Sequence, residues 1–123
     1  MDITIIIVSY NVKEYIVSCI DSIYKHSKSN IEFEIIVVDN NSKDGTTDKL
    51  GEKFPKINLI KNKRNIGFSK ASNQGAEQSR GRFLFFLNPD TLFTEDSISI
   101  LYSESKKIER FGALGPMLIS QSG

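Results

Sequence analysis

Short runs of β-branched apolar residues, separated by segments with a helical spacing of apolar residues, constrain the fold of this chain most strongly. Between Ile3 and Val8, five of six residues are Ile or Val, which is typical of a strand in a sheet that is covered on both faces. Phe33–Val38 is a second buried strand of this kind, Ile57–Ile60 is a short third one, Phe83–Leu87 is a strongly apolar fourth run, and Ala113–Ile119 is a candidate fifth strand. Strand and helix therefore alternate, which favours parallel strands joined by crossover helices.

Four segments between these runs are predicted to form helices. The first places its apolar residues on one stripe between Val12 and Tyr24. The second must end before Pro55, because proline disfavours helical geometry in the residue that precedes it. The third is expected from about Gly67 to Ser79 with a C-cap at Gly81, and the fourth begins near Glu95. We therefore expect a three-layer α/β/α fold with a mainly parallel sheet in a single domain.

The composition is that of an ordinary globular protein. Of the 123 residues, 39% are hydrophobic and 25% are charged, and 16 basic residues against 15 acidic ones leave a net charge of +1. This near-neutral balance disfavours a nucleic-acid partner, which normally shows as a basic excess. One cysteine, Cys19, and one histidine, His26, predict neither a disulfide nor a zinc site. No stretch approaches the roughly 18 apolar residues of a membrane span, so we expect a cytoplasmic protein without a transmembrane segment.

The ends of the predicted strands are the expected place of a ligand site. In open parallel sheets, ligands bind outside the carboxyl ends of the strands. Neither common glycine-rich nucleotide motif follows the first strand, so side-chain carboxylates are the candidate ligand-binding groups. Asp39 is placed to bind a base or ribose hydroxyl, and Asp90 to hold a hard cation on a diphosphate. These positions predict a nucleotide-sugar site.

Each of these groups also has a structural interpretation. Asp39 and Asp90 could serve only as turn residues, and Asp44 is expected to favour the start of the second helix rather than to contact a ligand. The basic residues of the segment from Lys61 to Arg64 are expected to form a solvated face. The aromatic residues of the run Phe83–Leu87 are expected to lie in the core, since consecutive aromatics in a central strand usually do.

Four segments, in this order, carry a resemblance to a known family. They are Ile7–Asn11, Val38–Thr46, Asn65–Phe68 together with Asn73, and Phe86–Asp90. In sequence and spacing they resemble the family 2 glycosyltransferases with the GT-A fold. The resemblance implies transfer of a sugar from a nucleoside diphosphate donor, UDP- or dTDP-linked, to a glycan or lipid-linked acceptor in bacterial polysaccharide or cell-surface glycan synthesis.

The resemblance also implies a set of donor-binding residues. The nucleoside pocket would be lined by Ser9, Tyr10 and Asn11, with Asp39 on the base or ribose and Asn40 beside it. The floor beside the donor would be shaped by Asn65, Gly67 and Asn73. The last pair, Asn88 and Asp90, matches the D-x-D motif of the family, in which Asp90 would hold Mg²⁺ or Mn²⁺ on the diphosphate.

Two departures from the family pattern matter. Asn88 replaces the first acid of the D-x-D motif, as in rhamnosyltransferase-like members that carry Asn-Pro-Asp. The chain also ends about thirty residues after Asp90, whereas the general base of the family lies well beyond this motif, so we expect that base beyond Gly123. Residues 1–123 are therefore interpreted as the N-terminal nucleotide-sugar-binding domain of a longer enzyme, which binds donor but turns over poorly alone.

The implied reaction is a single inverting displacement, in which a carboxylate deprotonates the acceptor hydroxyl and a metal offsets charge on the departing diphosphate. One alternative is a non-catalytic or truncated donor-binding module. A sugar nucleotidyltransferase ranks below it, because the glycine-rich basic loop of those enzymes is missing after the first strand. We also expect apolar surface near Ala113–Ile119 to drive homo-oligomer formation. Action of the parent enzyme at the inner face of the membrane stays open.

Overall fold

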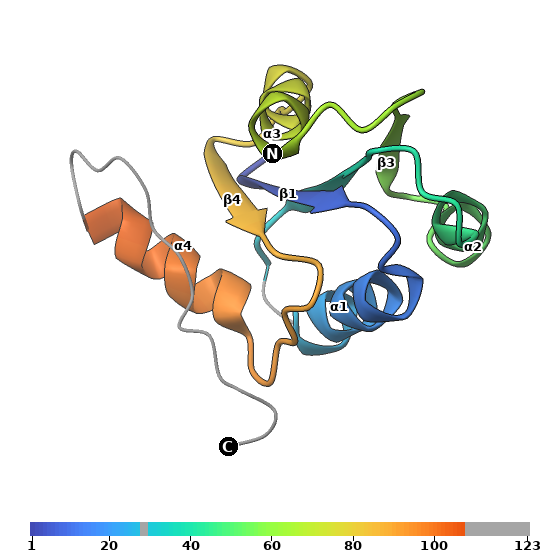
Figure 1. Ribbon diagram of the computed structural model, residues 1–123. Coiled ribbons are helices and arrows are strands. Elements are labelled where there is room, and N and C mark those ends of the chain that lie inside the picture. The colour runs from blue at the N-terminus through green and yellow to red at the C-terminus, as the bar shows by residue number, and fades with distance from the viewer. Residues whose placement is uncertain (28–29, 108–123) are drawn as a thin grey trace.

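The computed structural model describes residues 1–27 and 30–107, and Figure 1 shows their arrangement. Strands and helices alternate along the chain as the sequence predicts. The elements are β1 (Ile3–Ser9), α1 (Lys13–His26), β2 (Phe33–Asp39), α2 (Thr46–Lys53), β3 (Asn58–Lys61), α3 (Phe68–Glu77), β4 (Phe83–Leu87) and α4 (Ser97–Lys107). The candidate strand Ala113–Ile119 lies outside the described residues.

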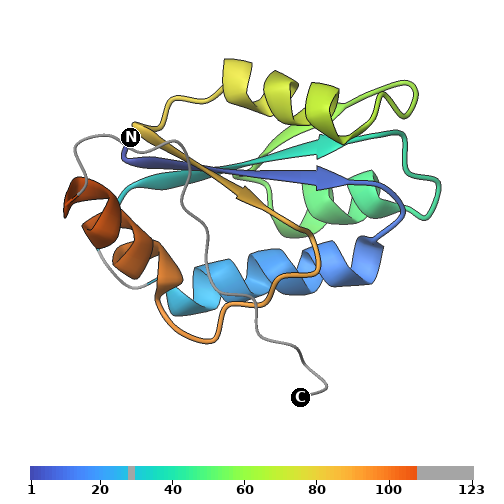
Figure 2. The ribbon, with the colours of Figure 1, turned by 60° about the vertical axis from the view of Figure 1, so that its left-hand side comes forward.

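The four strands form one parallel sheet with the order β3-β2-β1-β4. Helices α1, α2 and α4 lie on one side of this sheet and α3 lies on the other, which gives the predicted three layers (Figures 1 and 2). Because every strand runs in the same direction, the loops that follow them meet along one edge of the sheet, here called the carboxyl edge. At this edge Ser9 of β1 is the register partner of Asp39 of β2.

The core is divided between the two faces of the sheet by the alternation of side chains along each strand. The larger cluster lies under α1, α2 and α4 and includes Ile3, Ile5 and Ile7 of β1. The smaller cluster under α3 is built on Ile36, Val38 and Ala71. Small residues let α3 approach closely, since a Cβ added at Gly75 would lie 2.7 Å from Ile6 Cγ2. This is the close packing that small inward residues in this helix predict.

Gly81 does not cap α3, contrary to the prediction from sequence. The helix ends at Glu77, and Gln78 occupies the cap position. Gly81 instead lies against β1, where an added Cβ would stand 2.3 Å from Thr4 N and 2.5 Å from Ile3 C. A glycine is needed at this position because two backbone segments approach each other too closely for a side chain.

The aromatic residues of β4 are only partly in the core, which corrects the prediction for this strand. Within the described sheet β4 is an edge strand, and α3 packs against β1 and β2. Phe85 is buried and Phe83 packs edge-on against Tyr102 of α4, with ring centroids 5.8 Å apart. Leu84 and Phe86 alternate with these residues along the strand, so they lie on the other face of the sheet, and they are 36% and 49% exposed.

No helix within the described ranges has both the length and the apolar character needed to span a membrane.

Candidate functional site

Asp39 lies at the centre of the carboxyl edge and is almost completely buried, with 1% exposure. Its Oδ1 accepts hydrogen bonds from Ser9 Oγ at 2.7 Å and from Ser42 Oγ at 2.6 Å. Its Oδ2 accepts one from Ser42 N at 2.8 Å. A carboxylate oxygen can accept about two hydrogen bonds, so Oδ2 keeps one acceptor position. Asp39 thus organises the loop after β2, and its contact with a ligand stays a prediction.

The loops after β1 and β2 are joined by a reciprocal pair of hydrogen bonds. Asn11 N donates to Ser42 Oγ at 2.8 Å, and Lys43 N donates to Asn11 Oδ1 at 2.7 Å. Asn11 and Asn41 both have positive φ, 52° and 71°, a left-handed conformation that asparagine tolerates better than most residues. Next to this pair, Tyr10 is 48% exposed. The structure therefore brings the predicted residues of the first two loops together and holds them rigidly.

Ser42 belongs to this network, although the site predicted from the sequence does not include it. Its hydroxyl accepts from Asn11 N and donates to Asp39 Oδ1, so it connects the two loops directly. The signal for this role was its position three residues after the acid at the end of a buried strand, a spacing at which an aspartate side chain can accept a hydrogen bond from a backbone N–H, as it does at a helix N-cap.

The Asp44 carboxylate accepts hydrogen bonds from the first residues of two helices, α1 and α2. Its Oδ2 accepts from Lys13 N at 3.1 Å, at the first residue of α1, and its Oδ1 accepts from the backbone N–H and the hydroxyl of Thr46, the first residue of α2. Burial alone would raise the pKa of Asp44, but these hydrogen bonds together hold it below its ordinary value. The structural role expected for Asp44 is confirmed.

The loop after β3 is held by side-chain amides. Gly67 has φ 87°, and its N–H donates to Asn65 Oδ1 at 2.9 Å. Asn40, which is buried, donates from Nδ2 to Gly67 O at 3.3 Å and accepts from Asn62 Nδ2 at 3.0 Å. The structure thus brings Asn40, Asn65 and Gly67 together. It adds Asn62, which sequence reasoning missed because neither its type nor its position in a polar loop distinguishes it.

Asn73 is separated from this group. It lies on an exposed position of α3, and no hydrogen bond links it to Asn65 or Gly67 in the part of the chain that the structure describes. Its neighbour Gln74 points to the loop instead and pairs with Asn62.

Asn88 and Asp90 lie in an exposed turn after β4, in which Thr91 N donates to Asn88 O at 3.1 Å. Within residues 1–27 and 30–107, the Asp90 carboxylate forms no hydrogen bond or ion pair. Its charge still acts at a distance, since burial and, to a smaller degree, Asp90 raise the pKa of the Cys19 thiol to about 12. Asp90 is therefore a free carboxylate at the carboxyl edge, on the side of α1.

Comparison with known proteins decides the family. The family described as "Glycosyl transferase family 2" matches this chain over residues 4–121, which is nearly its whole length. The chain belongs to glycosyltransferase family 2. Among curated relatives, this chain is 35% identical over 117 residues to glycosyltransferase GlyA of Streptococcus pneumoniae, covering 90% of this chain and 16% of GlyA. It is 31% identical over 97 residues to the minor teichoic acid biosynthesis protein GgaB of Bacillus subtilis, covering 76% of this chain and 11% of GgaB.

Solved structures confirm the GT-A fold of the chain. TarS 1-349 of S. aureus superposes with a TM-score of 0.76 at 26% identity, over 87% of this chain and 33% of TarS 1-349. The mannosyltransferase PcManGT of Pyrobaculum calidifontis, in complex with GDP-Man and Mn²⁺, superposes with a TM-score of 0.71 at 25% identity, over 85% of this chain and 31% of that one. The chain spans less than two fifths of the length of these relatives and structures.

Within the described residues, the Asp90 carboxylate is a candidate point for a divalent cation. The described ranges contain no group of three or more His, Cys, Asp or Glu residues that could hold a metal ion by themselves. Mg²⁺ in phosphate sites commonly takes one or two carboxylates and completes its coordination with phosphate oxygens and water. The free Asp90 carboxylate fits that arrangement, in which the diphosphate of a donor would supply further ligands.

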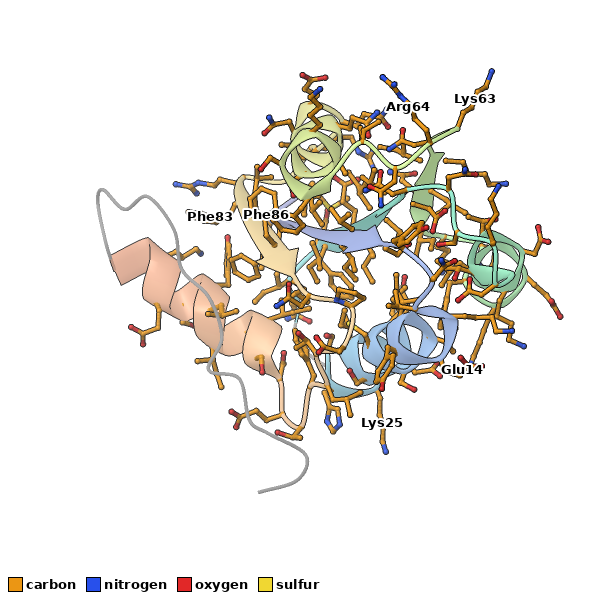
Figure 3. All side chains as sticks on the ribbon, in the orientation of Figure 1. Glu14, Lys25, Lys63, Arg64, Phe83 and Phe86 are labelled. Atoms are coloured by element: carbon orange, nitrogen blue, oxygen red, sulfur yellow. The ribbon has the colours of Figure 1, made fainter. Side chains whose placement is uncertain are left out.

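The basic residues of the β3–α3 loop point away from the sheet. Figure 3 shows Lys63 and Arg64 extending outward beyond α3 and β3, and both are exposed. This placement agrees with the expected solvated face.

Proposed function

We propose that this chain binds the nucleoside diphosphate sugar donor of an inverting, metal-assisted glycosyltransferase of bacterial polysaccharide or cell-surface glycan synthesis. The observation that carries the proposal is the network around Asp39, which fixes the loops after β1 and β2 with both oxygens of one buried carboxylate. Rigid loops at the carboxyl edge are what a preformed ligand site in a parallel sheet requires. The donors in similar structures, UDP-GlcNAc in TarS and GDP-Man in PcManGT, are of this chemical class.

The nucleoside is assigned to the loops after β1, β2 and β3. Tyr10 offers an exposed ring face for a base or ribose. Asp39 would accept one hydrogen bond at its remaining Oδ2 position, and Asn65 and Gly67 would form the floor. Asn73 is assigned to the outer part of that floor, because its exposed position on α3 leaves its amide available.

The diphosphate is assigned to the other side of the site, next to Asn88 and Asp90. Asp90 would hold Mg²⁺ or Mn²⁺, and the cation would offset negative charge on the departing nucleoside diphosphate. Asn88 contributes no charge, so the anionic character of this side rests on Asp90. The free state of the Asp90 carboxylate supports the assignment, since no hydrogen bond within the described residues has to be broken for it to bind a cation.

The acceptor hydroxyl must lose a proton to a general base. The resemblance to the family implies that this base comes from a segment after the Asn88–Asp90 motif, and we propose that it lies beyond Gly123. Residues 1–123 then act as the nucleotide-sugar-binding domain of a longer enzyme. We propose a UDP- or dTDP-linked donor, a glycan or lipid-linked acceptor and a cytoplasmic location. The alternative is a donor-binding module without catalytic activity.

The test is the thermal shift of the chain with UDP, dTDP and GDP, each with EDTA or with Mn²⁺. Ligand at about a hundred times its Kd should add roughly 2.7 kcal/mol, which is several degrees in Tm for a domain of this size. Asp90→Asn should remove the Mn²⁺-dependent part of the shift. Asp21→Asn, which changes an exposed carboxylate paired with Lys53, is the control and should leave the shift intact. No shift with any of the nucleotides would contradict the proposal for this chain.

A further inference from the structure

We propose that Asn62 and Gln74 are positioning residues that set the donor loop, residues Asn62–Gly67, in the conformation that receives the nucleoside. The inference rests on the proposed function, because it assigns the loop to nucleoside binding. Asn62 is the first residue after β3, and Gln74 lies in α3. The pair therefore joins the two elements that flank the loop.

The side-chain amides of Asn62 and Gln74 form two reciprocal hydrogen bonds. Asn62 Nδ2 donates to Gln74 Oε1 at 2.8 Å, and Gln74 Nε2 donates back to Asn62 Oδ1 at 3.0 Å. The second hydrogen of Asn62 Nδ2 is directed to Asn40 Oδ1 at 3.0 Å. A side-chain amide has two hydrogens to donate, so the donor capacity of Asn62 is fully used and its orientation is fixed.

Hydrogen bonds through the Asn40 side chain connect Asn62 to Gly67. Because Asn40 Oδ1 receives a hydrogen bond from Asn62, its Nδ2 is turned to Gly67 O at 3.3 Å. The backbone of Asn40 is itself held by a bond from its N–H to Ser9 O at 2.9 Å. Gly67 has φ 87°, and glycine moves easily between conformations. The carbonyl of Gly67 is therefore tied to the ends of β1 and β2 by a chain that begins at Asn62.

The Asn62–Gln74 pair lies far from Asp90, the residue proposed to hold the metal, so the two are expected to affect nucleotide binding independently. Strands β3 and β4 lie at opposite edges of the described sheet with β2 and β1 between them, a distance of about 14 Å at the usual spacing of strands. The donor loop follows β3, whereas Asp90 follows β4. A change at Asn62 or Gln74 should therefore alter the affinity for the nucleoside part by the same factor with and without a cation.

The experiment uses Asn62→Asp and Gln74→Glu, which keep size and shape but remove the donated hydrogens. Kd for UDP and GDP is measured in EDTA and in Mn²⁺, and amide hydrogen exchange is followed over residues 62–68. Gln74→Glu loses one donated hydrogen bond and Asn62→Asp loses two. Each variant should raise Kd for the nucleotide that wild type binds by roughly tenfold or more, and by the same factor in both media. Exchange in the loop should accelerate.

Two further measurements separate positioning from general stability. Glu34→Gln breaks the pair with Arg80 at the opposite end of the sheet and is the matched control: it should lower Tm but leave Kd and loop exchange unchanged. The Gln74→Glu variant regains a donor when its carboxyl is protonated, so its defect in Kd should shrink as the pH is lowered toward about 4.

Failure of the inference differs from failure of the proposed function. Wild-type affinity for a nucleotide, with unchanged Kd in both variants, overturns the positioning role alone. Unchanged exchange of residues 62–68 in both variants overturns it as well, whether or not wild type binds a nucleotide. A wild-type chain that binds none of the nucleotides overturns the proposed function and with it the assignment of the loop to the nucleoside.

Discussion

Ser9 and Asp39 are register partners on adjacent parallel strands, and the Ser9 hydroxyl donates to the Asp39 carboxylate at 2.7 Å. Both residues are buried, with 0% and 1% exposure. The last residues of two core strands are thus also the first residues of the candidate site. Stability and function are therefore coupled at this point, and a variant of Asp39 must be tested for both.

Asp39→Ala is expected to destabilise the fold as well as the site. The substitution removes the acceptor for Ser9 Oγ, Ser42 Oγ and Ser42 N and leaves buried donors without a partner, which should cost about 2–4 kcal/mol in the free energy of unfolding. Urea denaturation measures the loss. Ser9→Ala removes one donor only and should cost less. Equal losses in the two variants would show that the carboxylate is not the centre of the network.

Asp44→Asn is expected to flatten the dependence of stability on pH in acid. The pKa of Asp44 in the folded chain lies below its ordinary value of 3.8, so the carboxylate contributes its full stabilisation above about pH 4 and loses it as the pH falls through the lowered pKa. Neutral substitution of a carboxylate that accepts from the first N–H groups of two helices should cost about 1 kcal/mol at pH 7. Denaturation between pH 2 and 7 would show this, with Asp48→Asn in the first turn of α2 as the control. If the free energy of unfolding of wild type and of Asp44→Asn depended on pH in the same way, the role of Asp44 at the start of both helices would be contradicted.

Gly81→Ala and Gly51→Ala should change stability in opposite directions. An added Cβ at Gly81 meets the backbone of Thr4 and Ile3 at 2.3 Å and 2.5 Å, and a backbone segment in a parallel sheet cannot move aside, so a loss of at least about 2 kcal/mol is expected. At Gly51, in α2, nothing lies within 4 Å of an added Cβ, and alanine should add about 0.5–1 kcal/mol through its helix propensity. Thermal unfolding of both variants checks the pair. A neutral Gly81→Ala would mean that the segment before β4 does not approach β1 so closely.

The sequence was sufficient for features that depend on neighbouring residues. The apolar run of β1 and the stripe of α1 predict their elements, and the polar residues that follow each run predict the carboxyl edge. Proline disfavours helix in the residue before it, and α2 ends at Lys53, two residues before Pro55. In each case the physical cause acts within a few residues of the chain.

The features that the sequence did not predict depend on contacts between distant segments. Phe86 is exposed because β4 lies at the edge of the described sheet, and strand order cannot be read from an apolar run. The sequence predicts Gly81 as a helix cap, because its close contact with β1 involves a segment far away in the chain. Asn62 and Gln74 are ordinary polar residues whose pairing needs the position of α3 beside the end of β3.

Cys19 should resist alkylation in the native protein. The thiol is fully buried on the core side of α1, and burial, with a smaller effect of the Asp90 charge, raises its pKa to about 12. Only the thiolate reacts rapidly, so at about pH 8 modification by iodoacetamide should be slow and should rise sharply when urea unfolds the chain. Asp90→Asn should leave the native protein resistant, because burial is the larger cause. Rapid modification of the folded chain at the rate of a free cysteine would contradict the burial of this face of α1, and with it the packing that supports the carboxyl edge from below.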